Sequence, residues 1–112
     1  MKKLTVALVL MLGLGFVGVG AQAEDSPEAL MTAGLDALYA KGDPEAAAPI
    51  FRKVLEQNPS HYGATFQLAM ALDRAGKGAE ARPLWEKVLQ MAEGYKDEKT
   101  VDAARARLAQ KP

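Results

Sequence analysis

The sequence predicts an all-α protein made of two helical hairpins and a final capping helix. Three observations support this. The residues after position 23 are rich in Ala, Leu, Glu, Lys and Arg and poor in β-branched residues, a composition that favours helix over sheet. Residues 41–55 match residues 75–89 when the two are compared at an offset of 34 positions. Proline or glycine also marks most of the expected helix ends.

Residues 1–23 have the pattern of a secretory signal peptide. Lys2 and Lys3 precede an apolar run over residues 4–20, and Ala21, Gln22 and Ala23 form an Ala-x-Ala cleavage site. The run is shorter than the ~20 residues of a membrane-spanning helix and is interrupted by glycines. We therefore expect cleavage after Ala23, in preference to an uncleaved anchor. The mature domain, residues 24–112, is expected in the periplasm or secreted, with no stable membrane span.

The charged residues form no basic patch that could bind nucleic acid. Removal of Lys2 and Lys3 from the 14 basic and 14 acidic residues leaves a net charge of −2, and the charges are interspersed. Binding to phosphates requires a basic stripe or patch. The chain also has no cysteine, which excludes disulfides and a lipid-modified cysteine. The sequence thus favours a protein or peptide partner over nucleic acid.

The 34-residue repeat carries a resemblance to a known family. Glycines recur at Gly42 and Gly76, prolines at Pro49 and Pro83, and a small residue precedes an aromatic ring by four positions twice, as Ala47 with Phe51 and Ala81 with Trp85. Pro59 closes the first unit. This pattern resembles the tetratricopeptide repeat, a helix-turn-helix unit of 34 residues.

The resemblance implies a short right-handed α-solenoid with repeats at about 28–61 and 62–95 and a capping helix at about 98–110. Repeat one begins irregularly, because the family's tryptophan position carries Met31 and the next two conserved positions carry Gly34 and Leu35. In repeat two the tryptophan position carries Thr65, and Glu93 stands where the terminal proline is expected. We therefore expect a longer loop through residues 94–96.

Local signals set the helix ends. Ser26 and Asp43 each precede a proline at a first helical position, and Ser60 follows Pro59, so these residues are expected to cap helices. The expected helices span roughly 27–40, 44–57, 61–75, 78–92 and 98–110. Pro49 and Pro83 fall about five residues inside two of them. Either these helices kink, or they begin nearer the prolines.

Helical spacing predicts the core. The first helices of the two hairpins contribute one face each, and the second helices contribute the small residues and rings of the repeat: Met31, Leu35, Leu38, Thr65, Leu68, Ala69, Leu72, Ala47, Phe51, Val54, Ala81, Trp85 and Val88. In the last segment Val101, Ala104 and Leu108 form a narrow apolar stripe, while Glu98, Asp102, Arg105 and Arg107 are expected to face away. A helix with one apolar and one polar face suits the end of a repeat array.

No catalytic residues, cofactor or metal ligands are predicted. His61 is the single histidine and is expected on the surface at a helix start, and the only two serines, Ser26 and Ser60, are explained as helix caps. Zinc and haem sites need clustered ligands that the sequence does not supply. Gly76-Lys77-Gly78 lacks the strand and the third glycine of a phosphate loop, so we interpret it as a turn.

The family resemblance also indicates where a partner binds. In such arrays the first helices line a concave side, and the matching positions here are Thr32, Asp36, Tyr39, Phe66, Met70, Asp73 and Arg74. Phe66 and Met70 lie four residues apart and are not among the residues expected in the hairpin core. Either they form an open apolar groove, or neighbouring helices cover them. The Lys and Asn with which some relatives hold a peptide's terminal carboxylate are missing from these positions.

The predicted function is a non-catalytic adaptor or scaffold of the bacterial cell envelope that binds a protein or peptide. Two alternatives remain open at this stage. One is a self-associating module that dimerises to complete its core, because arrays of fewer than three repeats are marginally stable. The other is a subunit without chemistry of its own in a larger envelope complex.

Overall fold

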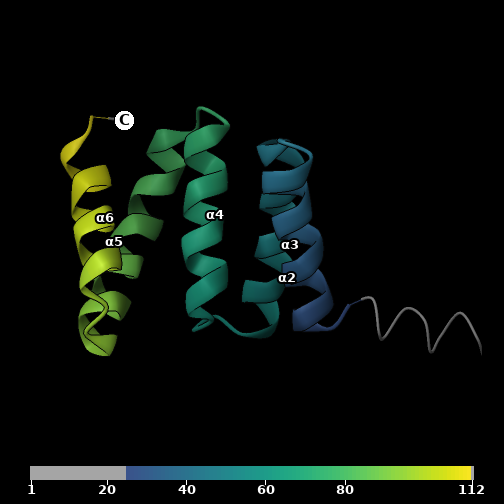
Figure 1. Cartoon of the computed structure of the whole chain (residues 1–112), viewed down its shortest axis with the longest axis horizontal. Coiled ribbons are helices and arrows are strands. Elements are labelled where there is room, and N and C mark those ends of the chain that lie inside the picture. The colour runs from purple at the N-terminus through teal and green to yellow at the C-terminus, as the bar shows by residue number, and fades with distance from the viewer. Residues whose placement is uncertain (1–24, 112) are drawn as a thin grey trace, which may run out of the picture.

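The computed structural model describes residues 25–111, all of whose regular elements are helical. The predicted signal peptide lies outside the described residues. The first hairpin consists of α2 (Pro27–Leu35), its direct continuation η1 (Asp36–Ala40) and α3 (Pro44–Gln57), and the second of α4 (Tyr62–Arg74) and α5 (Gly78–Tyr95). Helix α6 (Glu98–Ala109) follows. The helices stand side by side, from α2 and α3 at one end through α4 to α5 and α6 at the other (Figure 1).

Side-chain caps start four of the helices. Ser26 and Asp43 accept hydrogen bonds from the backbone N–H of Ala29 and Ala46 at 3.2 and 3.1 Å, as predicted. Asp97 does the same for α6. The predicted cap at Ser60 is wrong. Its N–H donates to Asn58 Oδ1 in a turn, and the N-cap of α4 is His61, whose Nδ1 accepts from Ala64 N–H at 3.0 Å.

The two predicted turn glycines adopt backbone angles that suit glycine. Gly42 has φ of 63° and Gly76 has φ of 77°, both in the left-handed region. The third turn differs from the prediction. Helix α5 does not end near residue 92 but continues through Gly94 to Tyr95, and Lys96, with φ of 58°, ends it in the left-handed conformation. Residues 93–95 contain no proline to stop the helix, so it runs on to this turn.

Pro49 and Pro83 lie inside their helices. Helices α3 and α5 begin at Pro44 and Gly78, so the alternative of a start near the internal prolines is wrong. Each proline removes the hydrogen bond to the carbonyl four residues earlier, at Glu45 or Ala79. All four residues are exposed. The lost hydrogen bonds thus lie on the exposed side of each helix, and both helices continue past the prolines.

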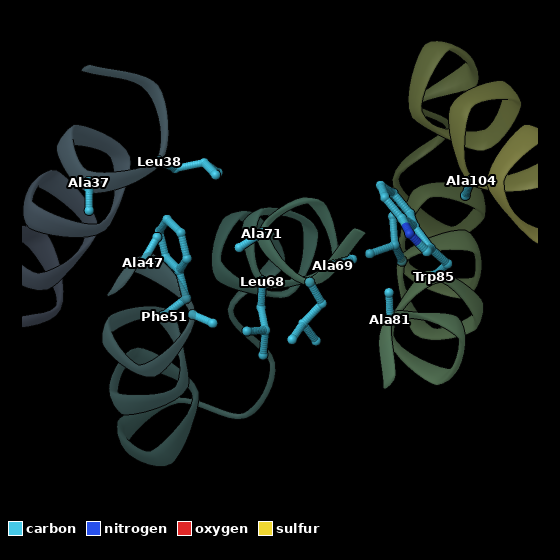
Figure 2. Close-up of a cluster of buried hydrophobic side chains, with 13 residues drawn as sticks. Ala37, Leu38, Ala47, Phe51, Leu68, Ala69, Ala71, Ala81, Trp85 and Ala104 are labelled. Carbon is cyan, nitrogen blue, oxygen red and sulfur yellow. The ribbon is translucent and has the colours of Figure 1, made fainter. Parts of the chain in front are cut away.

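One continuous core joins both hairpins to α6. Its main cluster runs from Ala37 and Leu38 in η1 to Ala104 in α6, with Phe51 and Trp85 as the two large rings. Figure 2 shows Phe51 beside Ala47 and Trp85 between α4 and the last two helices. The predicted second-helix core is confirmed, since Ala47, Phe51, Val54, Ala81, Trp85 and Val88 are all buried.

The first helix of repeat one contains one extra residue, which the structure accommodates as the π-helix η1. The caps Ser26 and His61 are 35 positions apart, whereas Leu38, within η1, and Leu72 of α4 are 34 apart. Before η1, therefore, Leu30 and Gly34 take the buried positions, and Met31 and Leu35 are only half-buried. The prediction that Met31 and Leu35 are central core residues was wrong because it applied one offset throughout.

Gly34 marks the closest approach of α2 to α3. A Cβ atom at this position would lie 2.5 Å from Cε1 of Phe51 and within 3 Å of two more atoms of the ring. The equivalent place in repeat two holds Ala69, on the side of α4 toward Trp85 (Figure 2). The small residue and the ring of each hairpin thus fit against each other.

Candidate functional site

A set of side-chain contacts joins the first helices η1, α4 and α6 to one another. We call the surface that carries these contacts the first-helix face, and its residues are Tyr39, Phe66, Gln67, Met70, Asp73, Arg74 and Arg107. Five of the seven residues that the sequence predicted for binding lie on it. Gln67 and Arg107 were not predicted to belong to it.

Tyr39, Gln67 and Arg74 form the contact between η1 and α4. The hydroxyl of Tyr39 donates to Gln67 Oε1 at 2.7 Å, and the guanidinium carbon of Arg74 lies 4.9 Å from the centre of the tyrosine ring. Tyr39 is nevertheless 47% exposed. The ring is therefore held in one orientation while much of its surface faces solvent.

Asp73 joins α4 to both α5 and α6. Its Oδ2 accepts from the indole N–H of Trp85 at 2.7 Å and from Nη1 of Arg107 at 3.3 Å. The guanidinium of Arg107 also lies 5.7 Å from the centre of the Trp85 ring. The prediction that Arg107 faces away from the array was wrong. A long arginine stem lets the charged group reach back over α5, and the carboxylate of Asp73 and the face of the indole both favour it there.

Phe66 and Met70 are partly buried and pack against the main core. Phe66 meets Trp85 edge-to-face with 5.4 Å between the ring centres, and Arg107 Nη2 lies 3.9 Å from the sulfur of Met70. The interpretation that the hairpin core leaves these two side chains unused was therefore wrong. Residues of α5 and α6 cover part of each, and the rest is accessible.

Thr32 and Asp36 lie apart from these contacts. The hydroxyl of Thr32 donates to the carbonyl of Glu28 in its own helix, and Asp36 forms an exposed ion pair with Lys41 at 3.5 Å. The extra residue explains the position of Thr32. Before η1 the offset is 35, so Met31 is the residue that corresponds to Phe66. The sequence contains no clear signal of this, because the predicted caps Ser26 and Ser60 are 34 positions apart and only the observed cap His61 makes the spacing 35.

The arrangement of the hairpins agrees with a comparison of the chain with known protein families. A family model described as tetratricopeptide repeat matches residues 32–98, more than half of the chain. The chain belongs to the tetratricopeptide repeat family. No curated protein and no solved structure matches it. Repeats of this family are generally non-catalytic modules for protein–protein interaction and scaffolding.

A second cluster of the tetratricopeptide array lies where α4 and α6 begin and α5 ends. The hydroxyl of Tyr62 donates to Asp97 Oδ2 at 2.9 Å, and Tyr95, 66% exposed, lies with its ring centre 5.2 Å from that of Tyr62. Burial raises the pKa of Tyr62 above its ordinary value, and Asp97 adds to the effect. Hydrogen bonds from Thr100 and Tyr62 hold the pKa of Asp97 below its ordinary value.

Two further features bear on the chemistry that the array can perform. Among residues 25–111, no three or more His, Cys, Asp or Glu side chains are grouped so that they could hold a metal ion. In the same part of the chain, none of the helices has the length and apolar character needed to cross a membrane. What the first-helix face offers is a set of oriented aromatic, apolar and cationic groups, which suits binding.

Proposed function

We propose that this tetratricopeptide protein is an exported, non-catalytic adaptor that binds a protein or peptide segment on its first-helix face. The observation that carries the proposal is Tyr39. It is one of two large hydrophobic residues that are exposed among residues 25–111, and unlike an ordinary surface tyrosine it is held by Gln67 at its hydroxyl and by Arg74 at its ring.

The fixed orientation of Tyr39 favours binding for an energetic reason. Ordering a mobile side chain at an interface costs about 0.5 to 1.5 kcal/mol, and contacts already formed within the free protein reduce this cost. Tyrosine and arginine are also the residue types that most often contribute large shares of binding energy. The adjoining accessible parts of Phe66 and Met70 extend the apolar contact area along α4.

The charges of the first-helix face favour a binding partner that carries an acidic group. Asp73 is paired with Arg107, and Asp36 is paired with Lys41. Arg74 is exposed and forms no ion pair within residues 25–111. The face therefore presents an apolar surface beside a cation, which suits a segment with apolar anchors next to an acidic group.

The test is capture of partners from an extract of the compartment in which the protein resides, with Tyr39→Glu and Arg74→Glu as variants. Both side chains are exposed, so the variants should fold, whereas Phe66→Glu would disturb the packing against Trp85. Lys53→Glu, on the exposed side of α3, is the control. We expect Tyr39→Glu to weaken binding by about 2 kcal/mol or more and Lys53→Glu to leave it unchanged. Equal capture by all variants would refute the proposal.

Export is proposed on the pattern of residues 1–23. The basic start, the apolar run and the Ala-x-Ala site at residues 21–23 support it. We expect the native protein to begin at Glu24 and to occur outside the cytoplasm. Mass spectrometry of the protein isolated from its source tests this, and an intact N-terminus beginning at Met1 or Lys2 would contradict it.

A further inference from the structure

The end of the array carries an open groove along α6. It has a volume of about 470 Å³ and is lined by Glu93 of α5, by Lys96 of the turn, and by a row of residues on α6: Glu98, Val101, Asp102 and Arg105. None of the five charged residues of this groove forms an ion pair within residues 25–111. The groove lies apart from the first-helix face, whose contacts are made by Arg107 on α6.

The repeat itself indicates that a helix belongs in this place. Counting from the N-caps His61 and Asp97, Arg105 of α6 corresponds to Ala69 of α4. Ala69 is completely buried and faces Trp85 of α5 (Figure 2). The groove is therefore where a third hairpin would place its second helix. Because Arg105 is much larger than Ala69, a helix that covers the groove must lie farther from α6 than α5 lies from α4. At that distance Arg105 can form an ion pair with the covering helix.

Two of the charges on the groove, those of Glu98 and Arg105, can complement a second copy of the same helix. Glu98, Val101, Asp102 and Arg105 follow one another at intervals of three, one and three residues, so they share one face of α6. The acids lie toward the start of the helix and the arginine toward its end. If two such helices pair antiparallel, with Val101 and Asp102 at the centre, Glu98 of each copy meets Arg105 of the other.

We propose that the protein forms a symmetric dimer through α6, each copy supplying the helix that covers the groove of the other. A two-fold axis perpendicular to the paired α6 helices makes them antiparallel, and successive helices of a hairpin are antiparallel as well, so each α6 takes the direction that the second helix of a hairpin would have. Two Glu98–Arg105 pairs flank a centre where Val101 meets Val101 and Asp102 meets Asp102, so the four charges of these pairs have to offset the repulsion between the two Asp102 carboxylates. The first-helix faces of both copies stay free, so the dimer is a bivalent form of the adaptor.

Sedimentation of the purified protein from micromolar to millimolar concentration tests the proposal, with Glu98→Arg and Arg105→Glu as variants. Both residues are exposed, so circular dichroism should show unchanged helicity. Each variant alone brings like charges together twice, and we expect self-association at least about tenfold weaker. A mixture of the two variants restores both ion pairs across the interface and should form a mixed dimer, as should the double variant with itself.

The outcomes separate the possibilities. A monomer at every concentration would overturn the proposal. Self-association that neither variant weakens would place the interface elsewhere and also overturn it. A mixture that fails to associate, although each variant folds, would exclude the antiparallel pairing of Glu98 with Arg105. None of these results depends on whether a partner binds the first-helix face.

Discussion

At the scale of single residues, the packing of each hairpin depends on a small residue of the first helix that lies against an aromatic ring of the second. Gly34 lies under Phe51 so closely that no Cβ atom fits without movement of the ring, and Phe51 is completely buried. In repeat two, Ala69 and Trp85 belong to the same core cluster. Trp85 further donates its indole N–H to Asp73, which adds a directional bond to the packing. The core thus depends on shape at these positions as well as on apolar character.

Gly34→Ala should therefore destabilise the protein, although alanine is the better helix former. We expect a loss of about 1 to 3 kcal/mol because the added methyl group displaces the Phe51 ring. Gly94→Ala is the matched control. It lies in α5 with no atom within 4 Å of an added Cβ, so it should raise stability by about 0.5 to 1 kcal/mol. Urea denaturation measures both, and a stabilising Gly34→Ala would show that α2 does not lie this close to α3.

The carboxylate of Asp97 should make stability depend on pH at the acid end. Its pKa in the folded protein is held below the ordinary value of 3.8. The ionised carboxylate therefore contributes fully to the free energy of unfolding above pH 3.8, and this contribution is lost as the pH falls through the lower pKa of the folded state. Asn at this position keeps the cap but does not titrate. The unmodified protein should thus be more stable than Asp97→Asn at neutral pH, and this difference in the free energy of unfolding should shrink when the pH falls below the ordinary pKa. A difference that stays constant would contradict the assigned hydrogen bonds.

At the scale of elements, most of the fold could be predicted from the sequence. Most helix ends, the turn glycines and the second-helix core follow from caps, prolines and the 34-residue match, whereas the end of α5 at Tyr95 and the cap of α4 at His61 do not. The π-helix could not be predicted, because a comparison of the two repeats at a single offset of 34 positions hides the one extra residue in the first helix of repeat one. The reach of Arg107 back to Asp73 was also missed, because helical spacing gives the direction of a side chain at its base and not where a long stem ends.

The π-helix leads to a deletion experiment. Removal of Asp36 should restore a regular helix in which Gly34, Leu35 and Ala37 match Ala69, Met70 and Ala71. The cost should stay within about 1 kcal/mol, since only an exposed ion pair with Lys41 is lost.

Deletion of Arg52 from α3 is the control for this experiment. Arg52 is also exposed and forms one exposed ion pair, with Glu80, but α3 has no extra residue to remove. Its deletion turns Val54 away from Phe51 by about 100° and should cost more than about 3 kcal/mol. Thermal denaturation compares the two, and an equally damaging Asp36 deletion would mean that η1 is not an insertion.

At the scale of the whole molecule, residues 25–111 form a one-dimensional stack of two hairpins followed by α6. The core runs without interruption from η1 to Ala104, and each hairpin packs on its neighbour in the chain. Because the second helices α3 and α5 supply the buried rings, the first helices are free to carry Tyr39 and Arg74 at the surface. The division between packing and binding therefore follows from the repeat itself.

The most direct test of the account is photo-crosslinking from a single position of the first-helix face. A photoreactive phenylalanine analogue in place of Tyr39 should form covalent adducts with a protein partner in the native compartment, because the ring at this position is exposed and faces the proposed binding surface. The same analogue in place of Lys53 on α3 should form none. Adducts at Lys53 and none at Tyr39, with both variants folded, would contradict the claim that the protein binds through its first helices.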